Sequence, residues 1–135
     1  MRLPEHACAL LVDRRGRLVL QLRPAWARHA PSQLTCFGGK REGDETAEAC
    51  LRRELDEELG WAPELLAGDG LDLRSGERYI ARFFACAVPE GIALRPEPGF
   101  AIIHAHAASL PGLPLSPWHR TAIGAWRSGL AEAGV

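Results

Sequence analysis

The sequence predicts an α/β fold in which a mixed β-sheet is packed between helices. Strand-like apolar segments lie on both sides of one strongly helical segment, and a second helical segment closes the chain. The 135 residues, of which 47% are apolar and 24% charged, are enough to bury a core and have an ordinary globular balance. We therefore expect residues 1–135 to form a single domain.

The N-terminal segment predicts a β-hairpin. Residues 6–12 are mostly small and apolar, and three leucines alternate along residues 17–23. The turn between them, residues 13–16, ends in a glycine, which tolerates positive φ. A loop between Pro24 and Pro31 follows. A short apolar segment, 34–37, then leads into a glycine-rich segment, 38–43, which we expect to be a loop suited to close approach of an anion or a metal.

A helix is expected next. Asp44 is a suitable N-cap, and Glu45 would lie in the first turn, where an acid suits the helix dipole. Gly60, followed by Pro63, is a natural end.

The remaining elements are predicted from the lengths of the apolar segments and from the prolines and glycines that bound them. Residues 79–88 predict a buried strand, residues 101–106 a second strand, and the proline-rich residues 111–117 a loop. A final helix is expected to begin at Ser116 or Pro117 and to run through Leu130.

Composition argues against several classes of function. The net charge of −1 lacks the basic excess that a nucleic-acid polymer or an anionic membrane surface would require. The four cysteines are scattered with no Cys-x-x-Cys pair, which argues against a disulfide framework or a zinc site. The first apolar run is too short for an export signal, and no segment is long enough to span a membrane, so we expect a cytoplasmic protein.

The acids of the central helix indicate a cation. On a helical wheel, Glu54 and Glu58 share the stripe of apolar residues that should pack against the domain, and Glu57 lies at its edge. Unpaired carboxylates are costly to bury, and like charges one turn apart repel each other. A bound divalent ion such as Mg²⁺ removes both penalties. A solvated acidic face is the alternative, but it does not account for acids on an apolar stripe.

These residues resemble the Nudix box: a glycine, five residues, Glu, seven residues, and then Arg-Glu-U-x-Glu-Glu-x-Gly-U, where U is bulky and apolar. Here Gly39 is followed after five residues by Glu45, and after seven more by Arg53-Glu54-Leu55-Asp56-Glu57-Glu58-Leu59-Gly60-Trp61. Trp61 is less usual than an aliphatic residue at the last position. The resemblance implies an α/β/α sandwich and hydrolysis of a pyrophosphate bond in a nucleoside diphosphate linked to another moiety, with Mg²⁺ or Mn²⁺ as cofactor.

The resemblance also implies roles. Glu57 and Glu58 would be the principal metal ligands, joined by the carbonyl of Gly39. Glu54 would be a further ligand or a base that orients the attacking water, and Arg53 would pair with Glu45 to orient the catalytic helix.

Residues outside the box are assigned more loosely. A further acid often comes from a later loop in the family, and Glu97 is the best candidate, although an exposed loop acid would have the same sequence signature. Arg23 and Lys40 are candidate phosphate ligands. Tyr79 lies about where family members that act on dinucleoside polyphosphates tend to carry a tyrosine. Several aromatic residues, Trp26 among them, could form a base-stacking surface or belong to the core.

Alternatives of other classes remain at this point. A nucleotide-sensing module that binds without cutting is one, but such modules commonly lose a box acid and all are present here. A structural domain whose acidic helix contacts a basic partner is another. The expected partner is a small nucleotide substrate. Because dimers are frequent in the family that the sequence resembles, a homodimer is a further expectation.

Overall fold

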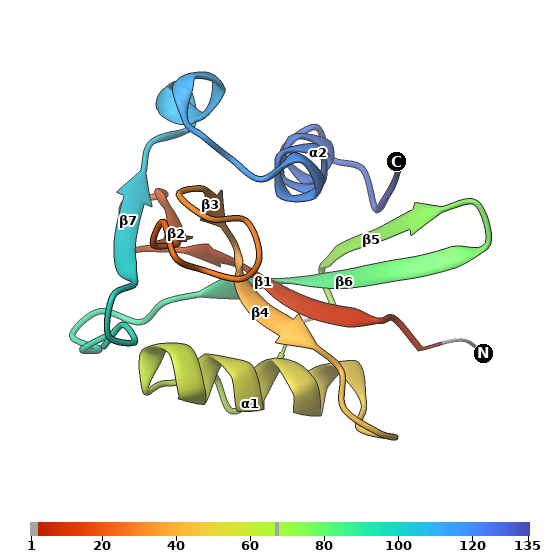
Figure 1. The fold of residues 1–135 in the computed structure, drawn as a ribbon, viewed down its shortest axis with the longest axis horizontal. Helices are drawn as coiled ribbons and strands as arrows, with labels where there is room; N and C mark the ends of the chain where they lie inside the picture. Colours follow the sequence, from red (N-terminus) through yellow and green to blue (C-terminus); the bar gives the residue numbers. More distant parts are fainter. Residues whose placement is uncertain (1–2, 67) are drawn as a thin grey trace.

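The computed structural model describes residues 3–66 and 68–135, and a mixed sheet forms its centre (Figure 1). Across these residues the sheet has eight strands in the order β3-β2-β1-β6-β5-β8, with β4 paired to β1 and β7 paired to β2. The strands are β1 (His6–Val12), β2 (Leu18–Leu22), β3 (Leu34–Thr35), β4 (Phe37–Lys40), β5 (Gly70–Ser75), β6 (Arg78–Ala87), β7 (Ala101–Ala105) and β8 (Glu132–Gly134).

β1 is the central strand of the sheet and pairs with three others. It pairs in parallel with β6 along its whole length, while its first half pairs with β4 and its last two residues pair with β2, both antiparallel. β5 and β8 form the other parallel pair. This mixture of parallel and antiparallel pairs confirms the predicted mixed sheet.

The two α-helices cover opposite faces of the sheet (Figure 1). α1 (Ala47–Leu59) packs with the alternate residues of β1 and β2 that include Ala7, Ala9 and Val19. α2 (Pro117–Arg127) and the 3₁₀ helix η1 (Ala107–Gly112) pack with the opposite residues of the same strands. The predicted sandwich of a sheet between helices is therefore confirmed.

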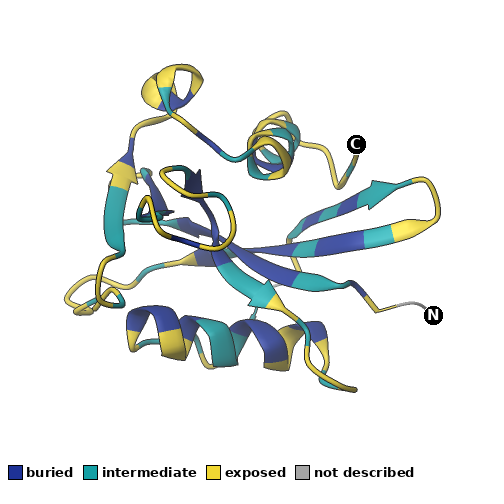
Figure 2. Ribbon diagram, in the orientation of Figure 1, coloured by how far each residue is buried: buried dark blue, intermediate teal, exposed yellow. Residues whose placement is uncertain are grey.

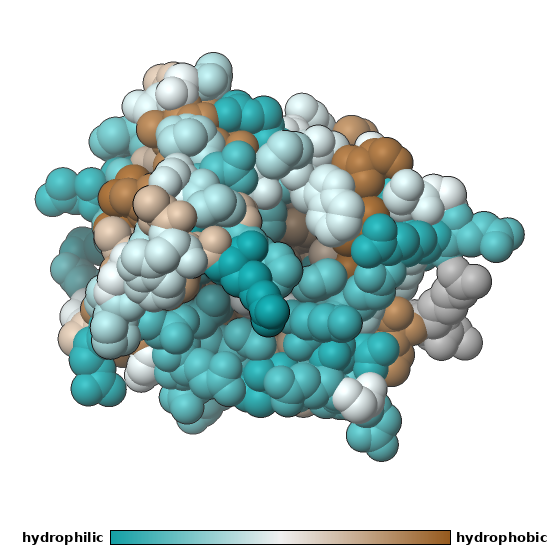
Figure 3. Space-filling model, viewed as in Figure 1, coloured by the Kyte–Doolittle hydropathy of each residue, from teal (hydrophilic) through white to brown (hydrophobic). Residues whose placement is uncertain are grey.

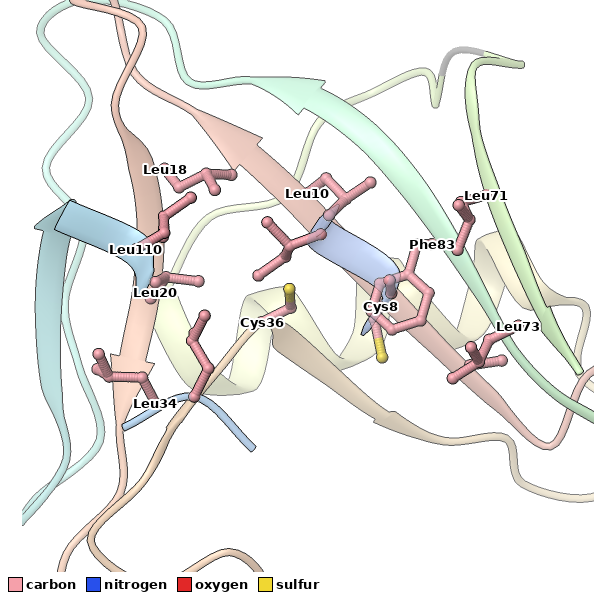
Figure 4. Close-up of a cluster of buried hydrophobic side chains, with 14 of the residues drawn as sticks. Cys8, Leu10, Leu18, Leu20, Leu34, Cys36, Leu71, Leu73, Phe83 and Leu110 are labelled. Atoms are coloured by element: carbon pink, nitrogen blue, oxygen red, sulfur yellow. The ribbon is translucent and has the colours of Figure 1, made fainter. Parts of the chain in front are cut away.

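The core under α2 is built from leucines of several strands (Figure 4). Period-two alternation sends Leu18 and Leu20 of β2 to this side, where they belong to one cluster with Leu10 of β1 and Phe83 of β6. In Figure 2 the buried parts of β1 and β6 lie side by side in the middle of the molecule, with α1 below them. Hydrophilic side chains cover the lower part of the same view, where α1 lies (Figure 3).

The hairpin and the ends of several elements agree with the sequence prediction. Residues 13–16 form the turn between β1 and β2, and Gly16 has φ of +77°. Gly60 ends α1 in the left-handed region with φ of +66°. β6 and β7 each lie within one residue of the predicted strands.

The predicted start of the central helix was wrong. Thr46, not Asp44, is the N-cap, and its hydroxyl accepts a hydrogen bond from the backbone N–H of Ala49 at 3.1 Å. Glu45 stays outside the helix because its carboxylate accepts hydrogen bonds from the N–H of Glu42 and from Arg53.

Further differences concern the glycine-rich segment and the C-terminal half. Gly38 to Lys40 form β4 rather than a loop, because they pair with β1. Pro111 lies in η1 rather than in the predicted loop, and α2 ends at Arg127 instead of Leu130. The sequence analysis did not identify β5 and β8. Within the described residues, no helix is both long enough and apolar enough to cross a lipid bilayer.

Candidate active site

Three polar residues are buried among the described part of the chain, and two of them are in contact. They are Gln21 of β2, Thr35 of β3 and Glu58 of α1, at 1%, 5% and 7% exposure. Gln21 is the register partner of Thr35, and its side-chain amide donates to Glu58 Oε2 at 3.4 Å. The Thr35 hydroxyl has no hydrogen-bond partner among the described residues. The apolar core is thus interrupted at the last turn of α1, where the box acids lie.

Glu58 is the most buried acid of the helix. The backbone N–H of Gly38 donates to its Oε1 at 2.8 Å. The pKa of Glu58 is raised to about 8, chiefly by burial and also by the negative charges of Glu54 and Glu97, although the hydrogen bonds from Gly38 and Gln21 act in the opposite direction. A cation at this point would remove the penalty on the charged carboxylate.

The two glycines of β4 allow the helix to approach the sheet. Gly38 has φ of +142°, and a Cβ there would lie 2.2 Å from the carbonyl oxygen of Ala7. A Cβ at Gly39 would lie 2.5 Å from Cδ of Glu54. The Glu54 carboxyl therefore rests against the backbone of Gly39, and its pKa is raised mainly by burial. Any larger residue at position 39 would displace it.

Arg53 joins the loop before α1 to the box acids. Its Nε and Nη2 donate to the two carboxylate oxygens of Glu45 at 3.1 and 2.7 Å, and its Nη1 donates to Glu54 Oε1 at 2.9 Å. Nη2 also reaches the carbonyl of Lys40 at 3.3 Å. The hydrogen bond from Arg53 lowers the pKa of Glu45 to about 2. The pairing of Arg53 with Glu45 that the resemblance implied is present.

Glu57 differs from the other two box acids in exposure. Its side chain is 55% exposed, against 17% for Glu54, and it lies 3.5 Å from Arg53 Nη1. The three acids thus range from buried Glu58 to exposed Glu57 along one side of the helix.

The donor set fits a hard divalent cation that completes its shell with other ligands. No group of three acidic, histidine or cysteine side chains in the described structure forms a ready-made metal cage. Mg²⁺ in proteins commonly takes only one or two carboxylates and keeps waters and substrate phosphates as its other ligands. Buried Glu58, with its raised pKa and two acidic neighbours, is a position where such an ion would be favoured.

The candidate residues outside the box lie in different places. Glu97, in the loop before β7, is close enough to Glu58 to raise its pKa. Arg23 follows β2, and its Nη1 donates to Gln21 Oε1 at 3.0 Å, so it is linked to Glu58 through one side chain. Lys40 is exposed at the end of β4. Tyr79 lies in the β5–β6 hairpin, where its hydroxyl donates to Asp72.

The sequence analysis did not identify Gln21 or Thr35. The signal for Gln21 was present, because it is the one polar residue of Leu18-Val19-Leu20-Gln21-Leu22, a strand otherwise composed of leucine and valine. A polar side chain inside such a strand requires a buried partner. The partner could only be identified once α1 was placed over β2.

Among the histidines and cysteines, Cys50 contacts this site: its Sγ donates to the carbonyl of Gly39 at 3.6 Å and accepts from Arg53 Nη2 at 3.9 Å. The Nδ1 of His104 lies 2.8 Å from Asp13 Oδ2. All four cysteines are buried and free, and burial raises the pKa of the Cys36 and Cys50 thiols to about 12. These thiols therefore stay protonated at neutral pH.

Comparison with known proteins identifies the family of this chain. The family model described as the NUDIX domain matches residues 2–121. No curated protein sequence matches the chain significantly.

Solved structures of similar fold include three that span most of this chain. A MutT protein from Methanosarcina mazei Go1 has a TM-score of 0.73 and 20% identity, with 96% of this chain and 97% of that chain covered. A MutT NUDIX hydrolase from Burkholderia pseudomallei has a TM-score of 0.66 and 25% identity, with 92% and 98% covered. The NUDIX domain of NrtR from Shewanella oneidensis, in complex with ADP ribose, has a TM-score of 0.67 and 16% identity, with 96% and 89% covered. The chain therefore belongs to the NUDIX family.

Proposed function

We propose that the protein is a Mg²⁺- or Mn²⁺-dependent hydrolase that cuts a pyrophosphate bond in a nucleoside diphosphate linked to another moiety, such as a nucleoside triphosphate or a nucleotide-sugar. One observation carries the proposal. Glu58 is buried beside Gln21 and the Gly38 N–H, with the charges of Glu54 and Glu97 nearby. A fold that gained nothing from these charges would replace them with apolar residues.

The box residues would divide the work as follows. Glu57, Glu58 and the carbonyl of Gly39 would hold the ion, with Glu54 as a further ligand or as the base that orients water. When bound, a divalent ion neutralises the phosphate oxygens and lowers the pKa of a coordinated water. The rigid helix fixes the carboxylates better than a loop could. Arg53 positions Glu54 through its Nη1 and is itself fixed by Glu45.

Residues outside the box would act on the substrate. Glu97 would supply the further acid, a role supported by the effect of its charge on Glu58. Arg23 would contact the substrate near Gln21, to which its Nη1 donates a hydrogen bond. Lys40 is exposed and would meet only an extended phosphate chain. Tyr79 is engaged by Asp72, so a role for it would require that hydrogen bond to break.

We also propose that residues 1–135 act as one domain in a reducing, cytoplasmic setting. The free state of all four cysteines supports that setting.

A substrate panel tests the proposal. Nucleoside triphosphates, nucleotide-sugars, ADP-ribose and dinucleoside polyphosphates are incubated with Mg²⁺ or Mn²⁺, and products are separated by chromatography. We expect a nucleoside monophosphate and a phosphorylated remainder from at least one class, and no turnover when the metal is chelated. Glu58→Gln should lower the turnover of such a substrate by orders of magnitude. Glu48→Gln is its matched control, because Glu48 is an exposed acid in the first turn of α1. Tight binding without cleavage would instead indicate a sensing module. The absence of both binding and cleavage would contradict the proposal.

A further inference from the structure

One aromatic side chain near the acids is left open to solvent. Phe37, Phe83 and Phe84 are buried in the core, and Tyr79 is hydrogen-bonded to Asp72. Trp26, in the loop after β2, is 71% exposed. A large indole held in the open has no role in the core, so its surroundings indicate what it contacts.

Trp26 packs on the turn that carries Glu97. Its ring meets that of Phe100 edge-on, with centroids 5.8 Å apart. A Cβ at Gly99 would lie 2.6 Å from the indole, so only glycine allows this approach. The N–H of Phe100 donates to the carbonyl of Glu97 at 3.0 Å, which closes the turn. The open aromatic surface therefore adjoins the proposed further acid.

Arg23 joins this aromatic pair to the buried acid. Its guanidinium carbon lies 5.4 Å from the centroid of the Phe100 ring. Its Nε donates to the carbonyl of His29 at 2.6 Å, and its Nη1 donates to Gln21, which donates to Glu58. The guanidinium is thus held at a fixed distance from both the aromatic pair and the catalytic helix.

A pocket of about 290 Å³ opens at this point. It is lined by the end of β2, the loop after it and the start of β7, including Arg23, Ser32 and Gly99. Its volume is at the lower end for small-molecule sites. Ala30 and Ser32 are the two non-glycine residues with positive φ in the described part of the chain, at +47° and +59°. Such strain is commonly kept where a loop must hold a binding geometry.

We propose that this pocket, with Trp26 at its margin, receives the base of the substrate nucleotide and holds it by stacking. The inference rests on the proposed function for the identity of the substrate as a nucleotide. Stacking uses the face of an aromatic base, which every nucleobase has, and a cation beside the ring adds to it. Ser32 supplies one hydroxyl for the edge of the base.

The test compares substrates with and without a base. In the Trp26→Ala variant, KM for a purine nucleoside triphosphate should rise about tenfold or more, the factor typical of one lost stacking contact. For ribose 5-triphosphate, which has no base, KM should change much less than it does for the purine nucleotide. Trp26→Phe should retain most of the affinity. Trp118→Ala is the matched control, because Trp118 is also an exposed tryptophan but lies in α2 and not beside the pocket.

Two outcomes would overturn the proposal. An unchanged KM for the purine substrate in Trp26→Ala would show that the indole does not bind the base. Equal losses with both substrates would show that Trp26 only supports the Glu97 turn.

Binding of the product separates this inference from the proposed function. By calorimetry, adenosine monophosphate should bind the wild-type protein more tightly than ribose 5-phosphate, and Trp26→Ala should abolish the difference. This result would stand even if no substrate in the panel were cleaved. Equal affinities in the wild-type protein would overturn the base pocket and leave the hydrolase proposal untouched.

Discussion

Arg53 holds the Glu45 carboxylate with two nitrogens, Nε at 3.1 Å and Nη2 at 2.7 Å, although Glu45 lies outside the helix that carries Arg53. The third nitrogen, Nη1, reaches Glu54 at 2.9 Å. One guanidinium therefore fixes both the loop before α1 and the direction of a proposed catalytic acid.

Replacing Arg53 by lysine should impair turnover more than folding. Lysine keeps the charge, but its single ammonium cannot hold Glu45 with two nitrogens and Glu54 with a third. We expect kcat to fall about 10- to 100-fold, as for other residues that orient metal ligands. Steady-state kinetics measure this, and circular dichroism checks the fold. Arg52→Lys is the matched control, since Arg52 donates hydrogen bonds to the carbonyls of Pro63 and Glu64. Equal effects of the two substitutions would contradict the positioning role.

Gly38→Ala should destabilise the protein far more than Gly43→Ala. At position 38 the new Cβ would meet the carbonyl of Ala7 at 2.2 Å and would also be strained by φ of +142°. At position 43 φ is +55° and nothing lies within 4 Å. We expect about 2–4 kcal/mol for Gly38→Ala and about 1 kcal/mol for Gly43→Ala. Urea unfolding followed by circular dichroism gives both values. Similar values would show that β4 can move away from β1.

Glu58→Gln should stabilise the metal-free protein increasingly as the pH rises. Burial raises the pKa of Glu58 from 4.5 to about 8, so the folded state binds the proton more tightly than the unfolded state. The resulting stability is complete below pH 4.5 and is lost as the pH rises through about 8. Glutamine does not ionise, and the variant should lack this loss. Thermal unfolding from pH 5 to pH 9 with a chelator measures the difference. If the difference in melting temperature between Glu58→Gln and the wild-type protein stayed constant with pH, the raised pKa of Glu58 would be contradicted.

His119 should make the stability of the folded protein depend on pH in the opposite direction to Glu58. Burial, together with the positive charges of His6 and Arg23, lowers the pKa of His119 from 6.5 to about 4, and its Nδ1 accepts the N–H of Cys36 at 3.0 Å. The unfolded chain therefore takes up a proton first, and stability is lost as the pH falls from about 6.5 to about 4. His119→Asn keeps an acceptor and should remove this loss. Melting temperatures of both proteins across that range are the measurement, with His106→Asn, at an exposed position, as control. A slope that persists in His119→Asn would contradict the assignment.

The sequence predicted the elements whose signals are local. Gly60 ends α1 where a left-handed residue is needed, and the apolar stripe of that helix correctly included Glu58. The start of the helix was misplaced because Asp44, Glu45 and Thr46 all suit a helix N-terminus. The choice among them depends on Arg53, which draws Glu45 out of the first turn through a contact across eight residues.

Features that depend on distant contacts could not be predicted in the same way. β8 is three residues long and exists through parallel pairing with β5. The position of Gln21 under Glu58 requires the register of β2 in the sheet and the placement of α1 over it. The nearness of Trp26 to Phe100 joins two loops that are far apart in the sequence. Local propensity carries no information on any of these contacts.

The most direct test of the central claim is the Mg²⁺-dependent turnover of the wild-type protein beside Glu57→Gln. Glu57 is exposed, so its substitution should leave folding intact while removing a proposed metal ligand. The rate of nucleoside monophosphate release from the best substrate of the panel is measured at increasing Mg²⁺. We predict a loss of kcat of at least about 100-fold in a variant with an unchanged melting temperature. Equal turnover by the two proteins at every Mg²⁺ concentration would contradict the assignment of the box acids as the catalytic metal site.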